Sequence, residues 1–422
     1  MTLRSERINI GKGINLNLIK TDKFKSNLIS IYLILPLERE NATKNALLPL
    51  VLKRGTSSLN TNLEIQRKLE DMYGSDLSIS VNKRGEKHVV RFTIEGPKES
   101  YVDDKKYMLK IIDLLRSLVY NPYLEDKVFS EKYVEQEKDN LSRLIEGRIN
   151  DKRSYALERC IEEMCRNERF SIYYLGYIED LGEIDNRILY EYYKDIILKA
   201  PIEIFYVGEY ENELIEYLTN CFKLEREDVF KIKREYVTGN VQTKNMVYED
   251  MDINQGKLVL GYKTGIPYEN SLYNGLLVAS EILGGGPNSK LFRSIREKES
   301  LAYYIGSKVY KYKSLMLIDG GIDSNNFERA IEIIRFKIDE MKKGDFIQED
   351  MDTAKKSIKT SMKSINDNIF LISEFFFSQV LADDKRLLEE SLIDIDKVTR
   401  EEIIQASNNI NLDTIYFLRK SR

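Results

Sequence analysis

The feature that most constrains the fold is an internal repeat: the second half of the chain repeats the order of segments in the first. In the first half an extended run, LISIYLILPL at residues 28–37, leads into a helix-like stretch and then into two alternating runs separated by a charged turn. QGKLVLGYKTG, at residues 255–265, opens the same order in the second half. Each half closes on a late extended run, at residues 201–208 and 412–418. The offset of roughly 220 to 230 residues is too long for a solenoid repeat and indicates a duplicated domain.

Alternating strands flanked by long amphipathic helices predict an α+β fold of two tandem homologous domains, each a mostly antiparallel sheet packed with helices. We expect the domains at residues 1–225 and 257–422, with a linker at residues 226–256. The linker range is polar and poorly periodic. Because it contains few glycines and no proline, it should be an ordered tether rather than a loose one.

Composition excludes several classes of protein. The 32% of charged residues nearly cancel to a net charge of −4, and no basic face of the kind that binds nucleic acid is visible. No window approaches 18 apolar residues, so no membrane span is expected, and the first residues hold no apolar leader. Cys160, Cys165 and Cys221 are odd in number and widely spread, which argues for a reducing compartment and a cytoplasmic protein.

The chain is poor in metal ligands. A hydrolase without a covalent nucleophile usually needs a metal to activate water, and zinc then takes three protein ligands plus that water. His88 is the only histidine, and it lies next to an alternating run, so we expect a partly exposed strand residue. Cys160 and Cys165 are five residues apart in a helix-like stretch, which places them on different faces, as packing residues rather than ligands. No metal is therefore expected in this chain.

Two segments contain distinctive sequence motifs. Arg54-Gly55-Thr56 follows the first helix-like stretch, and GGGPNSKLFRSIREKESLAY occupies residues 284–303. An Arg and a Tyr seven residues apart would arise by chance in a chain this rich in both. The full motif, with its triple glycine at Gly284, Gly285 and Gly286, is much more specific than the Arg–Tyr spacing alone.

Together with the order of segments, these motifs resemble those of the insulinase/pitrilysin zinc metallopeptidases. The resemblance is closest to the small bacterial members that are similar to mitochondrial processing peptidase. The resemblance covers nearly the whole chain. Active members carry His-x-x-Glu-His on the first helix, followed closely by Lys-Gly-Thr. Counted back from Arg54, the ligand and general-base positions fall on Ala46, Pro49 and Leu50. Alanine and leucine cannot ligate zinc, proline cannot act as a base, and Pro49 should also distort the helix interior.

The third zinc ligand of the family is a Glu on a later helix, seven residues after another Glu. In VEQEKDNLSRLIEG the earlier acid corresponds to Glu137 and the ligand position to Leu144. A slip of one residue, to Arg143, would not restore the ligand. Leu144 continues an apolar stripe with neighbouring residues, which predicts helix packing, and Glu137 is expected to be a solvated or ion-paired surface acid. The resemblance therefore implies a degenerate zinc site.

The second half of the chain keeps the Arg and Tyr positions of the family's active site. Active members need an Arg and a Tyr at this spacing, which correspond to Arg296 and Tyr303. The resemblance implies that Arg296 binds a substrate carbonyl through its planar fork and that Tyr303 stabilises the oxyanion. The alternative is that Arg296 pairs with a neighbouring acid and Tyr303 packs at a strand edge. The three glycines imply a loop near the substrate entrance, or else a plain interhelical turn.

The resemblance thus implies a non-catalytic subunit of a heterodimeric zinc peptidase, which binds an extended peptide and leaves zinc to its partner subunit. The alternative is a homodimeric peptide-binding or scaffold protein with no proteolytic role. Retention of Arg296 and Tyr303 favours the first interpretation, because a scaffold has no chemical need for them. No membrane or nucleic-acid partner is expected.

Overall fold

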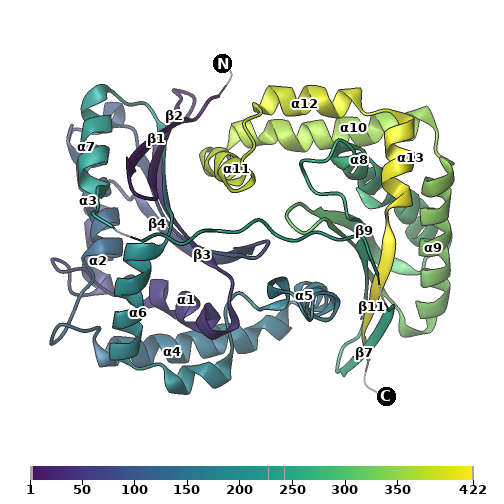
Figure 1. The fold of residues 1–422 in the computed structure, drawn as a ribbon, viewed down its shortest axis with the longest axis horizontal. Helices are drawn as coiled ribbons and strands as arrows, with labels where there is room; N and C mark the ends of the chain where they lie inside the picture. Colours follow the sequence, from purple (N-terminus) through teal and green to yellow (C-terminus); the bar gives the residue numbers. More distant parts are fainter. Residues whose placement is uncertain (1–2, 227, 242, 421–422) are drawn as a thin grey trace. The chain divides into compact units, whose positions relative to one another are not determined.

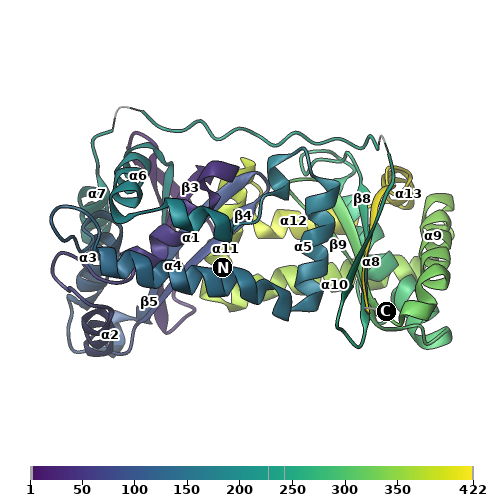
Figure 2. The same ribbon diagram turned by 90° about the horizontal axis from the view of Figure 1, so that it is seen from below.

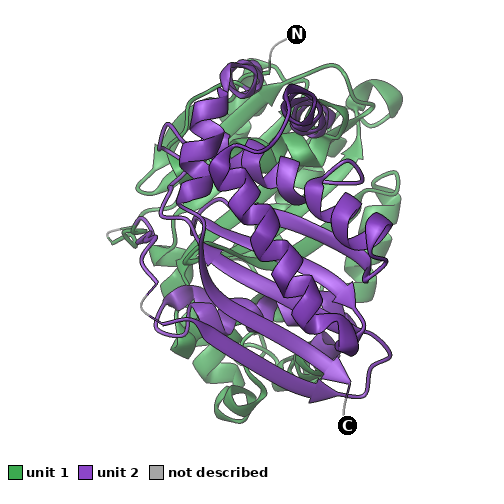
Figure 3. Cartoon of the chain, turned by 90° about the vertical axis from the view of Figure 1, so that its right-hand side faces the viewer, with its two compact units in different colours: residues 1–146, 172–233, 365–387 green, residues 147–171, 234–364, 388–422 purple. Residues whose placement is uncertain are grey.

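The computed structural model describes residues 3–226, 228–241 and 243–420 (Figure 1). These residues form two compact units, each assembled from three segments (Figure 3). Unit 1 comprises residues 1–146, 172–233 and 365–387, and unit 2 comprises residues 147–171, 234–364 and 388–422. Each unit thus takes one segment from the other half of the chain, whereas the sequence led us to expect the continuous ranges 1–225 and 257–422.

Unit 1 is built on a six-stranded sheet with the strand order β1-β2-β6-β3-β5-β4. All neighbours are antiparallel except β2 and β6. The strands are β1 (Glu6–Gly11), β2 (Ile14–Lys20), β3 (Ser26–Pro36), β4 (Asp76–Arg84), β5 (Lys87–Pro97) and β6 (Ile202–Gly208).

Helices cover both faces of this sheet, because successive side chains of a strand point to opposite faces. In β3, Ile31 and Leu33 belong to the large core on one face, whereas Tyr32 and Ile34 belong to a smaller cluster on the other. The large core is completed by helices of the first half of the chain: α1 (Arg39–Leu52), α2 (Asn62–Asp71), α3 (Tyr107–Tyr120), α4 (Glu131–Glu146), α6 (Asn186–Lys199) and α7 (Asn212–Phe222).

The smaller cluster is closed by α11 (Ile369–Ala382), a helix from the second half of the chain. The ring of Phe377 stacks on that of Tyr32 at 4.0 Å between centroids. Glu374 accepts a hydrogen bond from the Tyr32 hydroxyl at 2.9 Å and forms ion pairs with Arg84 and Arg91 at 2.6 and 3.0 Å. Stacking and a shared carboxylate therefore fix α11 to this sheet.

Unit 2 is built on a five-stranded sheet with the order β7-β11-β8-β10-β9. Its neighbours are antiparallel except β7 and β11. The strands are β7 (Asn245–Met251), β8 (Gly256–Lys263), β9 (Ala302–Tyr310), β10 (Leu315–Ile322) and β11 (Asn411–Lys420). Without β1, the unit 1 sheet has the same order and the same single parallel pair, so the topology agrees with a duplication. The predicted fold class, two α+β units with mostly antiparallel sheets, is confirmed.

The helices of unit 2 lie on both faces of its sheet (Figure 1). One face carries α8 (Tyr273–Gly284), α9 (Phe327–Lys343), α10 (Gln348–Lys363), α12 (Leu388–Lys397) and α13 (Arg400–Asn408). The other face carries α5 (Lys152–Met164), which comes from the first half of the chain and lies beside β8 and β9 in Figure 2. Arg153 of α5 pairs with Asp319 of β10, and Tyr155 donates to Glu249 of β7. In unit 2, α5 therefore covers the sheet as α11 does in unit 1.

The range expected to be a linker is partly structured. It contains β7, whose side chains are all at least partly exposed, so that its sequence NMVYEDM lacks the apolar alternation of a core strand. Before β7, Arg226 of unit 1 is buried and donates to the carbonyls of Lys12 and Ala200, both at 2.6 Å. In unit 2, Arg234 pairs with Glu269 at 2.9 Å. The segment before β7 is thus held at Arg226 within unit 1 and at Arg234 within unit 2.

Among the described residues, no helix is long and apolar enough to cross a membrane.

Candidate functional site

The positions expected to hold zinc lie on α1 of unit 1, and their side chains are part of the core. Ala46 is 1% exposed and belongs to the main core cluster, and Leu50 packs against that cluster. Pro49 lies inside the helix and is also buried. A proline there has no N–H to donate to the preceding turn. The three side chains offer no lone pair to a cation and fill the space with apolar atoms.

The later helix shows two departures from expectation. Glu137 of α4 is paired as expected, with Arg54 Nε at 2.5 Å from Oε1, but it is buried rather than a surface acid. Asn140 Nδ2 donates to its other oxygen at 2.9 Å. Leu144 is 46% exposed, so the prediction that it packs within the helix stripe is wrong. The stripe is buried at Leu141, and it has turned towards solvent by the last turn of α4.

The single histidine is also not where it was expected. His88, at the second position of β5, is fully buried instead of partly exposed. Asn45 Nδ2 and His88 Nδ1 lie 3.1 Å apart, and the Tyr192 hydroxyl donates to Asn45 Oδ1 at 2.5 Å. Since Asn45 uses its oxygen for Tyr192, its nitrogen faces His88, which then accepts as a neutral imidazole. Burial lowers the pKa of His88 to about 4, against the opposing effect of the Tyr174 carbonyl.

This buried polar cluster, formed by Asn45, His88 and Tyr192, was not predicted. Its only sequence signal is Asn45, a polar residue directly before the apolar run that holds the degenerate zinc positions. The cluster joins α1, β5 and α6. It lies in unit 1, and its chemistry is that of a buried polar network with a single imidazole rather than of a metal site.

No group of three or more His, Cys, Asp or Glu side chains in the described part of the chain is arranged to hold a metal ion. Cys160 and Cys165 are buried in the core cluster between α5 and the unit 2 sheet, which confirms their packing role. Burial raises the pKa of the Cys160 thiol, so it stays protonated and is a poor metal ligand.

We expect the purified protein to bind no stoichiometric zinc, because Ala46, Leu50 and Leu144 cannot replace histidine and glutamate ligands. Elemental analysis after dialysis measures this directly. About one zinc per chain that a chelator removes, with loss of folded protein, would contradict the expectation.

Arg296 lies on a short π-helix, Phe292–Lys298, in unit 2. Such single π-turns are rare and are frequently found at functional sites. The guanidinium group is exposed and lies 4.7 Å from the centre of the Phe292 ring. Within residues 243–420 and the other described ranges, it forms no ion pair. Arg296 is thus held by its own helix and has its donors directed to solvent.

Tyr303 is the extra residue of a β-bulge in the edge strand β9. Ala302 pairs with Ile322 and Tyr304 pairs with Gly321, so that Tyr303 has no partner residue on β10. Bulges at sheet edges redirect a side chain. The ring of Tyr303 is 72% exposed, so it does not pack at the strand edge. No hydrogen bond or ring contact joins Tyr303 to Arg296 in the part of the chain that the structure describes.

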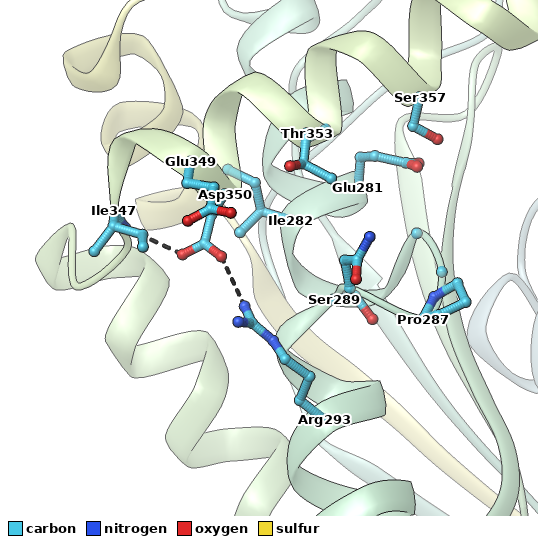
Figure 4. Close-up of a pocket in the computed structure, with 14 residues that line it drawn as sticks. Glu281, Ile282, Pro287, Ser289, Arg293, Ile347, Glu349, Asp350, Thr353 and Ser357 are labelled. Carbon is cyan, nitrogen blue, oxygen red and sulfur yellow. Dashed lines mark hydrogen bonds and ion pairs between the residues drawn. The ribbon is translucent and has the colours of Figure 1, made fainter.

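The glycine-rich segment follows α8 and has a packing reason at its first position. A Cβ on Gly284 would lie 2.6 Å from the backbone nitrogen of Ser307, so only glycine lets α8 approach β9 this closely. Gly286 has φ of +153° and open space around it. Gly285 and Gly286 line a cavity of about 250 Å³ against α10, where Arg293 pairs with Asp350 at 2.7 Å (Figure 4). The first glycine of the segment is therefore required for the close packing of α8 on β9.

Comparison with known proteins shows which families and relatives this chain is similar to. Residues 184–358 match the family model described as the Peptidase M16 inactive domain. A probable inactive metalloprotease of Bacillus subtilis (strain 168), YmfF, is 37% identical over 409 residues, which is 96% of each chain. An uncharacterized zinc protease of the same organism, YmxG, is 23% identical over 54% of this chain and 56% of its own length.

Solved structures show the same fold over the whole length. A conserved protein from Enterococcus faecalis V583 has a TM-score of 0.92 at 26% identity, with 99% of each chain covered. A protease from Helicobacter pylori has a TM-score of 0.80 at 16% identity, with 99% of this chain and 100% of that chain covered. A peptidase M16 inactive domain from Pseudomonas fluorescens has a TM-score of 0.78 at 17% identity, with 100% of this chain and 99% of that chain covered.

Proposed function

Because this chain belongs to the M16 peptidase family as a non-catalytic member, we propose that it is the substrate-binding subunit of a heterodimeric zinc peptidase. In this proposal a zinc-bearing relative supplies the catalytic centre, and this chain supplies Arg296 and Tyr303. The substrate is an extended peptide. Zinc in the partner would supply the activated water; this chain contributes no metal ligand.

The observation that carries the proposal is the contrast between the two half-sites. In unit 1 the metal positions are occupied by apolar side chains: Ala46 lies in the core, Leu50 packs against it and Leu144 is exposed. In unit 2 Arg296 and Tyr303 are exposed on a π-helix and a β-bulge. Both backbone features are uncommon and are frequently found at functional sites, so their presence at these two residues favours a retained binding role over drift.

The chemistry expected of these two side chains follows from their type. The planar guanidinium of Arg296 has five donors in a fixed fork, which suits a peptide carbonyl oxygen of the substrate. The phenol of Tyr303 can donate one hydrogen bond to an oxygen that becomes negative during attack on the peptide bond. Neither group acts as a nucleophile or as a general base here, so the chain alone is expected to cleave nothing.

The proposal first requires that this chain forms a complex with a zinc-bearing relative. When this chain is co-expressed with a zinc-bearing M16 relative encoded in the same genome, we expect a one-to-one complex that survives size-exclusion chromatography with light scattering. The chain alone should be a weak homodimer. A strict monomer that forms no complex with the relative would contradict the heterodimer. A homodimer that excludes the relative would favour a homodimeric peptide-binding or scaffold protein.

A further inference from the structure

A cavity of about 620 Å³ lies beside α9 in unit 2, and we call it the α9 cavity. Its walls come from α9, from the end of β8, from the start of β11 and from the segment before β7. Its volume is in the range of small-molecule sites. The polar and charged side chains in its lining include Lys244, Tyr262, Arg335, Asp339, Lys342 and Asn411.

The lining is electropositive. Arg335 and Lys342 are seven residues apart on α9, which places them on one face of the helix, and Lys244 approaches from outside α9. None of these three cations forms an ion pair among the described residues. Elsewhere on α9, Arg329 pairs with Glu299 and Lys337 pairs with Glu340, whereas Lys343 forms no ion pair among the described residues. One acid, Asp339, stands against three unpaired cations, so the cavity favours an anion.

Tyr262 gives a second, independent indication of a ligand. It lines the cavity, it is 2% exposed, and its hydroxyl has no hydrogen-bond partner in the part of the chain that the structure describes. Buried hydroxyl groups are normally paired, so an unpaired one needs an explanation. Burial raises the pKa of Tyr262, which therefore stays protonated and available as a donor, while the charge of Arg335 acts in the opposite direction. A buried donor next to unpaired cations suits an acceptor with negative charge.

We propose that the α9 cavity binds a small, multiply charged oxyanion through Arg335, Lys342 and the hydroxyl of Tyr262. Arg335 supplies a planar fork and Lys342 a point charge, the two ways in which proteins hold phosphate and carboxylate oxygens. Tyr262 lines the same cavity, and its buried hydroxyl is the neutral donor of the proposed site. The site is independent of the peptidase proposal, because it uses none of the residues invoked there.

The test is isothermal titration calorimetry of the full chain with pyrophosphate, and with citrate to separate a phosphate ligand from a polycarboxylate. One-to-one binding of at least one of the two is expected. Arg335→Gln and Lys342→Gln should each weaken it by about tenfold or more, the usual loss for a charge-assisted hydrogen bond. Tyr262→Phe should weaken it by about two- to tenfold.

Lys337→Gln is the matched control, because it removes the same charge from the same helix outside the cavity lining. It should change the affinity by less than about twofold. Tyr262→Phe should melt no lower than the parent, since the hydroxyl has no hydrogen-bond partner among the described residues. The proposal is overturned if neither anion binds, if Lys337→Gln weakens binding as much as Arg335→Gln, or if Tyr262→Phe leaves the affinity unchanged.

Discussion

Replacement of Tyr303 by Phe should lower the peptidase turnover of the reconstituted pair by about 100- to 1,000-fold, the usual cost of removing one oxyanion donor. The substitution deletes a single hydroxyl from a residue that is 72% exposed and whose side chain forms no hydrogen bond to any described residue. Folding and assembly should therefore be unchanged. The measurement is the turnover number of the complex on an extended peptide at saturating concentration.

Arg296→Lys serves as the comparison variant. It keeps the positive charge but loses the planar fork, so it should mainly raise KM and leave kcat closer to the parental value. The two substitutions thus act on different constants if the residues have the proposed roles. Parental rates with both residues altered would mean that this chain has only a structural role.

The second large effect is a loss of stability in acid that comes from His88. Its folded-state pKa is about 4, below the ordinary value of 6.5, because the ring is buried. The unfolded chain therefore binds a proton between these values while the folded protein does not. The stability that the neutral ring allows is fully present above about pH 6.5 and is lost as the pH falls towards 4. The shift corresponds to about 3 kcal/mol.

This effect can be isolated because the chain has one histidine. His88→Gln keeps a neutral polar group beside Asn45 and cannot gain a charge. The difference in unfolding free energy between the parent and this variant should change by about 3 kcal/mol from pH 7 to pH 4, with the parent losing more. The imidazole signal in a proton NMR titration should report the same pKa. Titration near 6.5, with parallel pH profiles for the two proteins, would show that the ring is accessible to solvent.

The sequence predicts the fold class and the duplication well, because strand alternation and the order of segments are local signals. It does not show that α5 and α11 are exchanged between the units. An amphipathic helix has an apolar face, but that face does not specify which of two similar sheets it covers. β7 was also missed, because an edge strand with exposed side chains lacks the apolar alternation by which a strand is recognised.

At the candidate site the residue types were easier to predict than their surroundings. The loss of ligands at Ala46 and Leu50 is visible from identity alone. The burial of His88 and Glu137 is not, since each depends on partners distant in sequence, Asn45 and Arg54. The π-helix under Arg296 and the bulge at Tyr303 involve backbone geometry that has no clear residue signature.

The central claim is that this chain completes the active site of a metal-bearing partner. The most direct measurement is the peptidase activity of the purified zinc-bearing relative as increasing amounts of this chain are added. We expect little activity for either protein alone, and a rise that saturates at one chain per partner. A partner that is as active alone as in the mixture, with the complex formed, would contradict the claim.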